Sequence, residues 1–277
     1  MKKKGIWALV IIWIFVLLIL TPFVFTFIGS FQGENNLNKG NFQLIPSEVT
    51  LQNYADLLLE NLGLLAFRFN LFNSFKVGIG VCLLSIVIAV MGAYSLSHFN
   101  FRGKEVIARS MLFLYVFPTI LMISPIYGLL AGMGLIDSHL GLILVHTTLV
   151  SPFCIWLLKS FFDALPPEVE EAAIIDGASR LTVIRRIIIP LTAPGILTIG
   201  IYALIYSWGE YTFSAIIINS AKHKTIPMAL AGYMVQHSFK WGRMLAGCSL
   251  NFVPLVCIFM PLLKNFLKGF TAGAVKQ

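Results

Sequence analysis

Six long stretches of this sequence contain no Asp, Glu, Lys or Arg, and they limit what the chain can fold into. An ionised side chain at the centre of a bilayer costs at least about 2.5 kcal/mol, and a helix needs about 20 apolar residues to cross the hydrocarbon core. We therefore predict an all-α membrane protein with six transmembrane helices. The charge-free stretches are Gly5 to Gly33, Val77 to Phe101, Ser110 to Ile136, Ser138 to Leu158, Ile187 to Gly209 and Met244 to Leu263.

Composition argues against the other broad classes of protein. Of the 277 residues, 58% are apolar and 12% are charged, whereas charged residues make up about 25% of soluble domains. The four cysteines lie in apolar stretches and form no C-x-x-C pair, so we expect neither a disulfide framework nor a metal site. The net charge of +8 reflects orientation in a membrane protein. We expect membrane lipid around the chain and no nucleic-acid partner.

Basic residues predict the orientation. Lys2, Lys3 and Lys4 precede a first stretch that is too long for the core of a signal peptide and has no small-residue cleavage site behind it. Most of the 20 Lys and Arg residues then fall on the amino-terminal side of the membrane, which the positive-inside rule makes cytoplasmic. We therefore expect both termini in the cytoplasm. The external connection Ser220 to Arg243 breaks the rule with four basic residues, so we expect it to meet either substrate or a binding protein.

Prolines modify two of the predicted spans. Pro190 and Pro194 interrupt the beginning of the fifth stretch, so this span is expected to start after Pro194 and to continue to about Asn219. Glu210 then becomes a charge inside the membrane. Prolines within other spans, among them Pro118, are expected to kink their helices.

The predicted cytoplasmic connection, Lys159 to Pro194, contains two short helices that together form a knob suited to docking. Ala172 and Ala173 would let a partner approach closely, and Glu171 beside them offers a charge for one specific cation. A DNA-binding helix-turn-helix and a plain loop without a partner are the alternatives, and the membrane span on each side disfavours DNA. The expected elements are a helix that begins at Leu165-Pro166-Pro167-Glu168 and stops at Gly177, and a second helix, Arg180 to Ile189, capped by Ser179 and ended by Pro190.

These residues carry a family resemblance. The segment from Glu171 to Pro190 resembles the E-A-A-x3-G-x9-I-x-L-P signature of ABC importer permeases. Glu171-Ala172-Ala173 is followed after three residues by Gly177, and after nine more by Ile187, one further residue and Ile189-Pro190, with Ile189 in place of Leu. The tail, Gly269 to Lys276, resembles the T-A-G-x-V-K ending of the smaller permease in the maltose-type branch, which imports di- and oligosaccharides. The stretch Trp208-Gly209-Glu210-Tyr211 departs from the family's Trp-Asn-Glu at Gly209.

The resemblance implies a half-pore with three kinds of protein partner: a homologous second permease, a cytoplasmic ABC ATPase dimer and an external solute-binding protein. ATP and Mg would be held by the ATPase, because this chain has no G-x4-G-K-[ST], and no cofactor or enzymatic activity is expected of the chain itself. The implied ATPase-coupling residues are Glu171, Ala172, Ala173, Asp176, Gly177, Ile187 and Pro190. The implied tail contacts are Thr271, Ala272, Gly273 and Lys276, in a strand-like tail at the ATPase dimer interface or in a disordered end.

The predicted organisation follows from these assignments. Residues 1–30 form the first transmembrane helix, and residues 31–70 form an external loop. Residues 71–268 form a five-helix permease core with the coupling loop at 160–194, and residues 269–277 form a cytoplasmic tail. The cargo is predicted to be a di- or oligosaccharide. Glycerol phosphate or another polar solute, an acidic saccharide, and a secondary transporter remain as alternatives.

Trp208, Glu210 and Tyr211 are the candidate translocation path. A carboxylate inside a span must pair with a cation, accept hydrogen bonds or stay protonated. Neighbouring residues point to different faces of a helix, so the three share a site only where the helix is unwound, which Gly209 permits. The alternatives are a helix–helix hydrogen bond that fixes the second permease, and a Glu210 in interfacial water. We expect His146 to be a packed, hydrogen-bonded histidine rather than a ligand or proton carrier.

Overall fold

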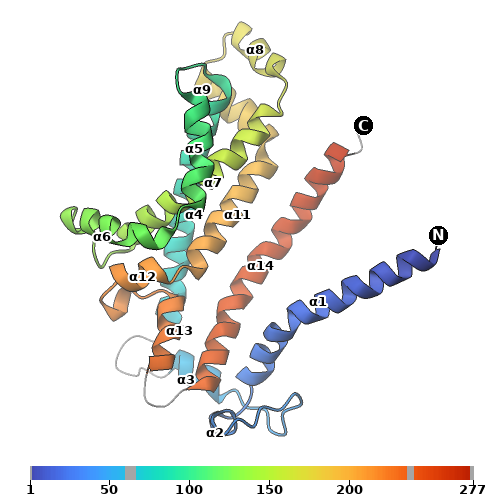
Figure 1. Ribbon diagram of the computed structural model, residues 1–277, viewed down its shortest axis with the longest axis vertical. Coiled ribbons are helices and arrows are strands. Elements are labelled where there is room, and N and C mark those ends of the chain that lie inside the picture. Colours follow the sequence, from blue (N-terminus) through green and yellow to red (C-terminus); the bar gives the residue numbers. More distant parts are fainter. Residues whose placement is uncertain (1, 60–66, 236–239, 275–277) are drawn as a thin grey trace. The chain divides into compact units, whose positions relative to one another are not determined.

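The structure, a computed structural model, describes residues 2–59, 67–235 and 240–274, and every regular element in these ranges is helical (Figure 1). The chain divides into two compact units. Unit 1 comprises Met1–Leu71 and Ile226–Leu255, and unit 2 comprises Phe72–Thr225 and Val256–Gln277.

Unit 1 contains a long amino-terminal helix and the region predicted as an external loop, which folds into short helices. Asn53 fastens this region to the end of α1, since its Nδ2 donates to the carbonyl oxygens of Ser30 (2.9 Å) and Gln32 (2.8 Å). Arg243 Nη2 donates to Asp56 Oδ2 at 2.8 Å and ties α14 to the same region. The elements are α1 (Lys2–Ser30), α2 (Glu34–Asn38), α3 (Gln52–Leu59), α13 (Ile226–Val235) and the first part of α14 (Trp241–Ala274).

Unit 2 is built around α4, α7 and α11, whose apolar residues form its core. Leu142, Leu158 and Ile199 have no exposed surface. A Cβ placed on Gly80 of α4 would lie 2.6 Å from Ile143 of α7, so the glycine permits the close approach on which helix packing in membranes depends. The elements of this unit are α4 (Phe67–His98) from Phe72 onward, α5 (Lys104–Val116), η1 (Thr119–Met122), α6 (Ile123–Gly132), α7 (His139–Asp163), α8 (Pro167–Ile175), α9 (Arg180–Val183), η2 (Ile184–Ile188), α10 (Ile189–Leu191), α11 (Ala193–Gly209), α12 (Thr212–Ile217), η3 (Ala221–His223) and the part of α14 from Val256 onward.

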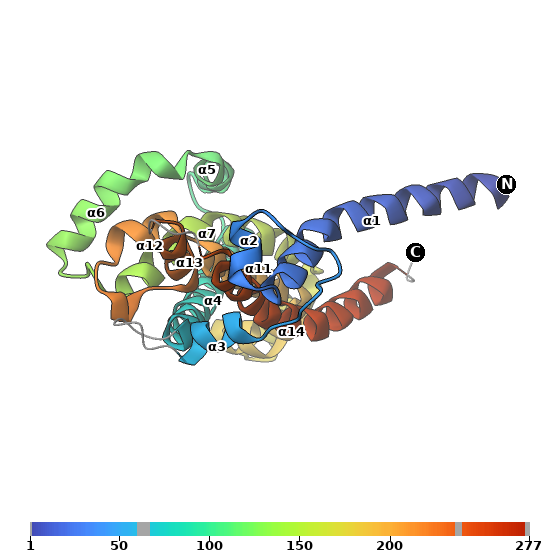
Figure 2. The same cartoon turned by 90° about the horizontal axis from the view of Figure 1, so that it is seen from below.

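Four of the described helices are long and apolar enough to cross a membrane: Leu9–Ser30, Phe67–His98, His139–Asp163 and Trp241–Ile258. Two bent helix pairs raise the number to six if each pair is one span. The predicted third span breaks at Pro118 into α5 and α6, which lie at 97° to each other. Figure 2 shows α5 end-on and α6 extending away from it. This span is therefore not the single kinked helix predicted, because Phe117 before the proline is extended (ψ 133°).

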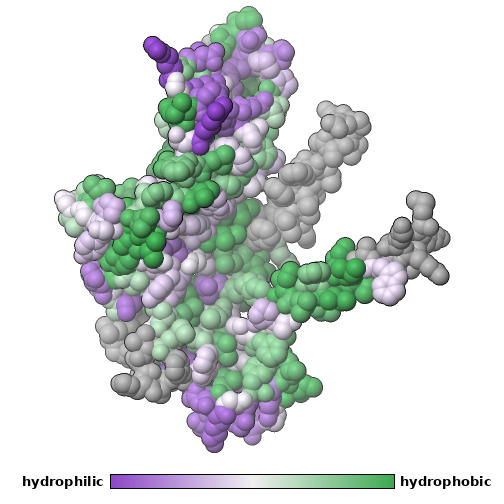
Figure 3. Space-filling model, viewed as in Figure 1, coloured by the Kyte–Doolittle hydropathy of each residue, from purple (hydrophilic) through white to green (hydrophobic). Residues whose placement is uncertain are grey.

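The second bent pair joins Arg180–Leu191 to Ala193–Gly209 at 81°. The bend lies at Thr192, between the two prolines that were expected to interrupt the fifth span. Hydrophilic side chains gather at the end of unit 2 that carries α8 and α9, and apolar side chains cover the surface below it (Figure 3). This polar end contains the first candidate site.

Candidate functional site

The connection between α7 and α11 projects as a pair of short helices, which we call the docking loop (residues 165–191). Its first helix, α8, begins at Pro167 and carries acidic residues in its first turn, where they stabilise the positive end of the helix dipole. The helix closes at Asp176, and Gly177 takes a φ of +85°. This left-handed conformation favours glycine and confirms the predicted stop.

The second helix of the docking loop differs from the prediction after its first turn. Ser179 caps it as expected, with its side chain accepting from the Thr182 amide at 3.3 Å. The helix does not end at Pro190, however, because a π-helical turn, η2, leads into α10, which runs through Pro190 to Leu191. A wider turn ahead of a proline accommodates a ring that an α-helical turn would exclude.

The predicted coupling residues lie at the surface of the docking loop. Glu171, Ala172, Asp176, Gly177 and Pro190 are exposed, and Ala173 and Ile187 are partly exposed. Sequence analysis missed three apolar side chains of α8, Val169, Ile174 and Ile175, which are 38%, 43% and 84% exposed. Their exposure could not be predicted, because the sequence did not show which face of α8 lies against the rest of unit 2. Exposed apolar side chains beside a charge are typical of a surface that binds protein.

α8 also borders a cavity of about 540 Å³, which Glu170, Glu171 and Ile174 line from this helix. Its polar lining includes His98 from the end of α4, Asp163, Glu170 and Arg180. Glu170 is 8% exposed although Glu171 beside it is exposed. Glu170 therefore faces the rest of unit 2, and the second helix of the docking loop buries Val183 and Ile188.

The fifth predicted span is interrupted at Glu210, which was a candidate path residue. α11 ends at Gly209, Glu210 is extended (φ −74°, ψ 120°), and α12 starts at Thr212. The local unwinding that the sequence permitted is therefore present. Glu210 caps the new helix: Oε1 accepts from the Phe213 amide at 2.8 Å and Oε2 from the Ser214 amide at 3.1 Å.

His146 of α7 is the partner of this carboxylate. Its Nε2 lies 3.1 Å from Glu210 Oε2, its Nδ1 lies 3.0 Å from Ser207 Oγ, and the residue has no exposed surface. His146 is thus a packed, hydrogen-bonded histidine, as predicted, but sequence analysis did not find its pairing with Glu210. Residues 64 positions apart give no pairing signal in a single sequence.

The three candidate path residues do not share one open surface. Trp208 is 1% exposed and packs edge-on against Phe75, with ring centroids 4.8 Å apart. Glu210 is largely buried, and only Tyr211 is open, at 47%. Glu210 therefore links the break between α11 and α12 to His146 of α7 inside the protein.

A row of aromatic side chains crosses three helices of unit 2, and sequence analysis missed it. Tyr115 of α5 stacks on Phe153 of α7 (4.9 Å), and Phe153 contacts Tyr202 of α11 (4.6 Å). Tyr206 follows one turn later, 6.4 Å from Tyr202. The only sequence signal is the spacing of four between the two tyrosines, which places them on one helix face.

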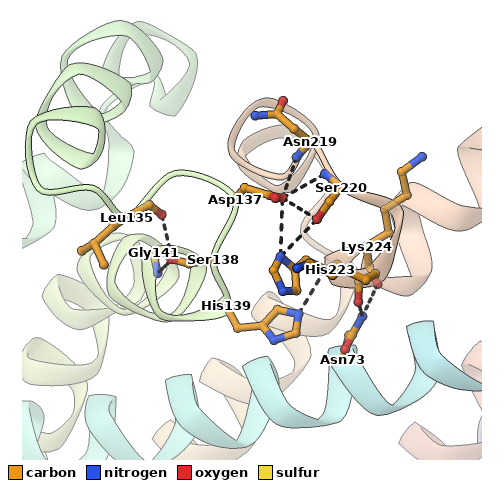
Figure 4. Close-up of polar contacts among 11 residues, drawn as sticks. Asn73, Leu135, Asp137, Ser138, His139, Gly141, Asn219, Ser220, His223 and Lys224 are labelled. Atoms are coloured by element: carbon orange, nitrogen blue, oxygen red, sulfur yellow. Dashed lines mark hydrogen bonds and ion pairs between the residues drawn. The ribbon is translucent and has the colours of Figure 1, made fainter.

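A second polar cluster, the Asp137 clamp, joins the α6–α7 connection to the turn at residues 219–224 (Figure 4). Asp137 Oδ1 accepts from the amides of Asn219 (3.0 Å) and Ser220 (2.9 Å) and from the Ser220 hydroxyl (2.9 Å). Burial raises the pKa of Asp137, but the hydrogen bonds from Ser220 and Asn219 outweigh it and lower the pKa to about 2. Asp137 has a φ of 57°, a left-handed conformation that Asp adopts more readily than most residues.

The same turn is held from α4 and α7. Asn73 Nδ2 donates to the carbonyl oxygens of Lys222 and Lys224, both at 2.9 Å, and His139 Nε2 lies 3.2 Å from the His223 carbonyl oxygen. Lys222 is nevertheless exposed. The basic connection noted in the sequence therefore begins with a fixed turn that displays a cation.

The carboxyl-terminal tail differs from its predicted conformation in the part that the structure describes. α14 continues through Ala274, so Thr271, Ala272 and Gly273 are helical and not strand-like. Lys276 lies outside the described residues. The sequence did not predict that the helix continues into the tail, because the tail contains glycines, which are poor helix formers.

Comparison with known proteins gives these features a common explanation. Residues 83–274 match the family of binding-protein-dependent transport system inner membrane components. The chain is 32% identical to the inner membrane ABC transporter permease protein YcjP of Escherichia coli, over 95% of this chain and 93% of the relative. It is 30% identical to the trehalose/maltose transport system permease protein MalG of Thermococcus litoralis, over 93% and 91%.

Solved structures agree in fold. A bacterial ABC transporter involved in the import of the acidic polysaccharide alginate superposes with a TM-score of 0.77 and 23% identity, over 95% of this chain and 96% of the other. These matches make the chain a multi-pass cell-membrane transport component and not an enzyme, as the sequence predicted. The chain belongs to the family of binding-protein-dependent transport system inner membrane components, the permeases of ABC transporters.

Proposed function

We propose that this chain is one of two permease subunits of an ATP-driven importer that carries a di- or oligosaccharide. The docking loop is the observation that carries this proposal, because it exposes Glu171 to Gly177 inside the segment that matches the family. A cytoplasmic ABC ATPase dimer, which holds ATP and Mg, binds this loop. A homologous second permease completes the path, and an external solute-binding protein delivers the sugar.

The internal contacts of unit 2 support six spans with both termini in the cytoplasm. The topology places Asn73, Asp137 and Ser220 outside, and these residues meet at one turn. It places His98 and Glu170 inside, and they lie 2.9 Å apart. Six spans require each bent helix pair to cross the membrane once, as a broken helix whose freed backbone groups lie within the protein.

The exposed surface of α1 supports a second permease and lipid as its neighbours. Its large apolar side chains are exposed on every face, for example Trp13 at 63% and Leu18 at 63%. A helix that is apolar all round is stable only inside a membrane or against other apolar protein.

We place the sugar path along the aromatic row and Tyr211 and not at Glu210. Aromatic faces stack on sugar rings, and the hydroxyls of Tyr115, Tyr202 and Tyr206 offer hydrogen bonds to a polyhydroxyl solute. The Glu210 carboxylate already accepts hydrogen bonds from the backbone amides of Phe213 and Ser214 and lies against His146.

An acidic saccharide is the second candidate cargo, and the fixed turn with Lys222 favours it. The structural relative involved in alginate import carries an acidic polysaccharide. Lys222 could instead bind an acidic face of the solute-binding protein. Replacing Lys222 would lower the affinity for the saccharide in the first case and the affinity for the solute-binding protein in the second.

The binding of trehalose, maltose and oligoalginate to the solute-binding protein, the receptor of this system, is measured first. The permease pair is then reconstituted with its ATPase in vesicles for uptake measurements. We expect ATP-dependent uptake of a neutral sugar that stops when the ATPase or the receptor is omitted. Uptake without the ATPase would refute the importer, and uptake of oligoalginate alone would replace the neutral sugar by the acidic one. Lys222→Gln then separates loss of receptor affinity from loss of substrate affinity.

A further inference from the structure

Two neighbouring carboxylates of α8 differ in their exposure. Glu171 is exposed, whereas Glu170 is 8% exposed and points toward α4. Successive residues of a helix differ by about 100° in direction, so a single helix can present one carboxylate to a partner and the other to its own protein.

Glu170 is held by two side chains from one turn of α4. The Tyr94 hydroxyl donates to Oε1 at 2.5 Å, and His98 Nε2 lies 2.9 Å from Oε2. Tyr94 is 3% exposed, and its ring stacks on His98 with centroids 4.5 Å apart and an interplanar angle of 16°. A buried carboxylate is costly unless its oxygens are engaged; here Oε1 accepts a hydrogen bond, and Oε2 lies within ion-pair distance of His98 without a hydrogen bond.

The second helix of the docking loop is fastened to the same end of α4. The guanidinium of Arg180, the first residue of α9, lies 4.8 Å from the centroid of the Phe99 ring, within the range of a cation–π contact. Between the two attachments lies the cavity of about 540 Å³ described above. Apolar packing therefore does not fill the space between α8 and α4, and the polar link through Glu170 spans it.

We propose that Glu170 is the positioning residue through which movement of the docking loop is transmitted to α4. This inference rests on the proposed function, in which the ATPase binds the outer face of α8. Coupling between distant sites requires a contact whose arrangement both sites bias. A short, two-point link from α8 to Tyr94 and His98 provides one, since α8 cannot be displaced without pulling α4 or breaking the link.

The experiment measures whether α8 and α4 move together. Spin labels at Glu168→Cys and Met91→Cys, both at exposed positions, report the distance from α8 to α4 in a background without the native cysteines. The complex with the ATPase is compared without nucleotide and with vanadate-trapped ATP. With Glu170 present, we expect the same distance in both states. In Glu170→Ala, we expect the distance to shift by about 1–2 Å or more, the size of typical helix shifts at interfaces.

Transport gives a second readout. Glu170→Ala should retain the ATPase while uptake per ATP hydrolysed falls about tenfold, which corresponds to about 1.4 kcal/mol of lost coupling. Tyr94→Phe removes a single hydroxyl and should give part of the same loss, and the double variant should lose no more than Glu170→Ala alone. Glu168→Ala is the matched control, because it removes an exposed carboxylate from the same helix and should leave both ATPase binding and uptake per ATP at the parent values.

The inference is overturned if the label distance stays constant in Glu170→Ala, even where the complex is less abundant or melts earlier, because that pattern belongs to a purely structural contact. It is also overturned if Glu170→Ala loses the ATPase while Glu168→Ala retains it. Failure of the proposed function has another signature, since the parent protein then does not co-purify with the ATPase.

Discussion

Replacing Glu210 should damage the stability of the complex and not its gating. The carboxylate is 8% exposed, accepts hydrogen bonds from the amides of Phe213 and Ser214, and lies 3.1 Å from His146 Nε2. Removing one partner of a buried pair costs about 3–5 kcal/mol, because the other is left uncompensated. We therefore expect Glu210→Ala to prevent assembly or to lower the melting temperature by many degrees.

Glu210→Gln separates the two hypotheses for this residue. Glutamine keeps the shape but has one acceptor oxygen where glutamate has two, so it can serve only part of the present set of donors. Loss of a hydrogen bond to a charged group costs about 1.5–3 kcal/mol, and the melting temperature should fall by several degrees. Uptake per surviving complex should stay at the parent value.

The assay compares melting of the purified complex with uptake normalised to complex content. His146→Gln should destabilise the protein by a similar amount, and the double variant should lose less than the sum because the two residues share one contact. Tyr211→Phe, at the exposed neighbouring position, serves as the control for melting. A Glu210→Gln complex that is as stable as the parent but transports poorly would refute this reasoning and restore Glu210 as a gate.

The remaining predictions concern the docking loop, the Asp137 clamp and the tail. Gly177→Pro should abolish transport and leave membrane insertion intact, because Pro cannot adopt the φ of +85°; transport at the parent rate would remove this turn from the mechanism. The Asp137 pKa is lowered from 3.8 to about 2, so its stabilising contribution is present above 3.8 and lost as the pH falls toward 2. Melting of Asp137→Asn should therefore differ from the parent at neutral pH and converge with it near pH 2, and a constant difference would contradict the clamp. Deleting residues 271–277 should lower ATP hydrolysis coupled to transport without loss of assembly, and unchanged turnover would indicate a tail without function.

The sequence predicted the features that depend on neighbouring residues. Four of the six charge-free stretches lie in single helices long enough to cross a membrane, and the predicted stop at Gly177 and cap at Ser179 are also present. The break after Gly209 was also accessible, because a glycine beside an intramembrane carboxylate permits an unwound segment.

The features that were missed are those that neighbouring residues do not specify. The chain bends by 97° at Pro118 instead of kinking, and at Pro190 the helix continues by way of a π-helical turn. A proline in the sequence signals an interruption but does not specify which of these geometries forms. The partners of Glu210 and Glu170 lie 64 and 76 positions away. One sequence cannot reveal which of two adjacent glutamates faces inward until the helix has been placed.

One continuous helix connects the two polar sites of unit 2. Near its start, Asn73 of α4 binds the carbonyl oxygens of the turn at Lys222 and Lys224, and at its end Tyr94 and His98 hold Glu170 of the docking loop. At 1.5 Å per residue, the helix carries these contacts roughly 37 Å apart from Asn73 to His98. A helix without a break resists bending. Displacement of the end of α4 that contacts Glu170 must therefore shift or tilt the end that carries Asn73 as well. The turn with its exposed Lys222 is therefore connected to the docking loop through α4, and in the proposed function these two sites lie on opposite sides of the membrane.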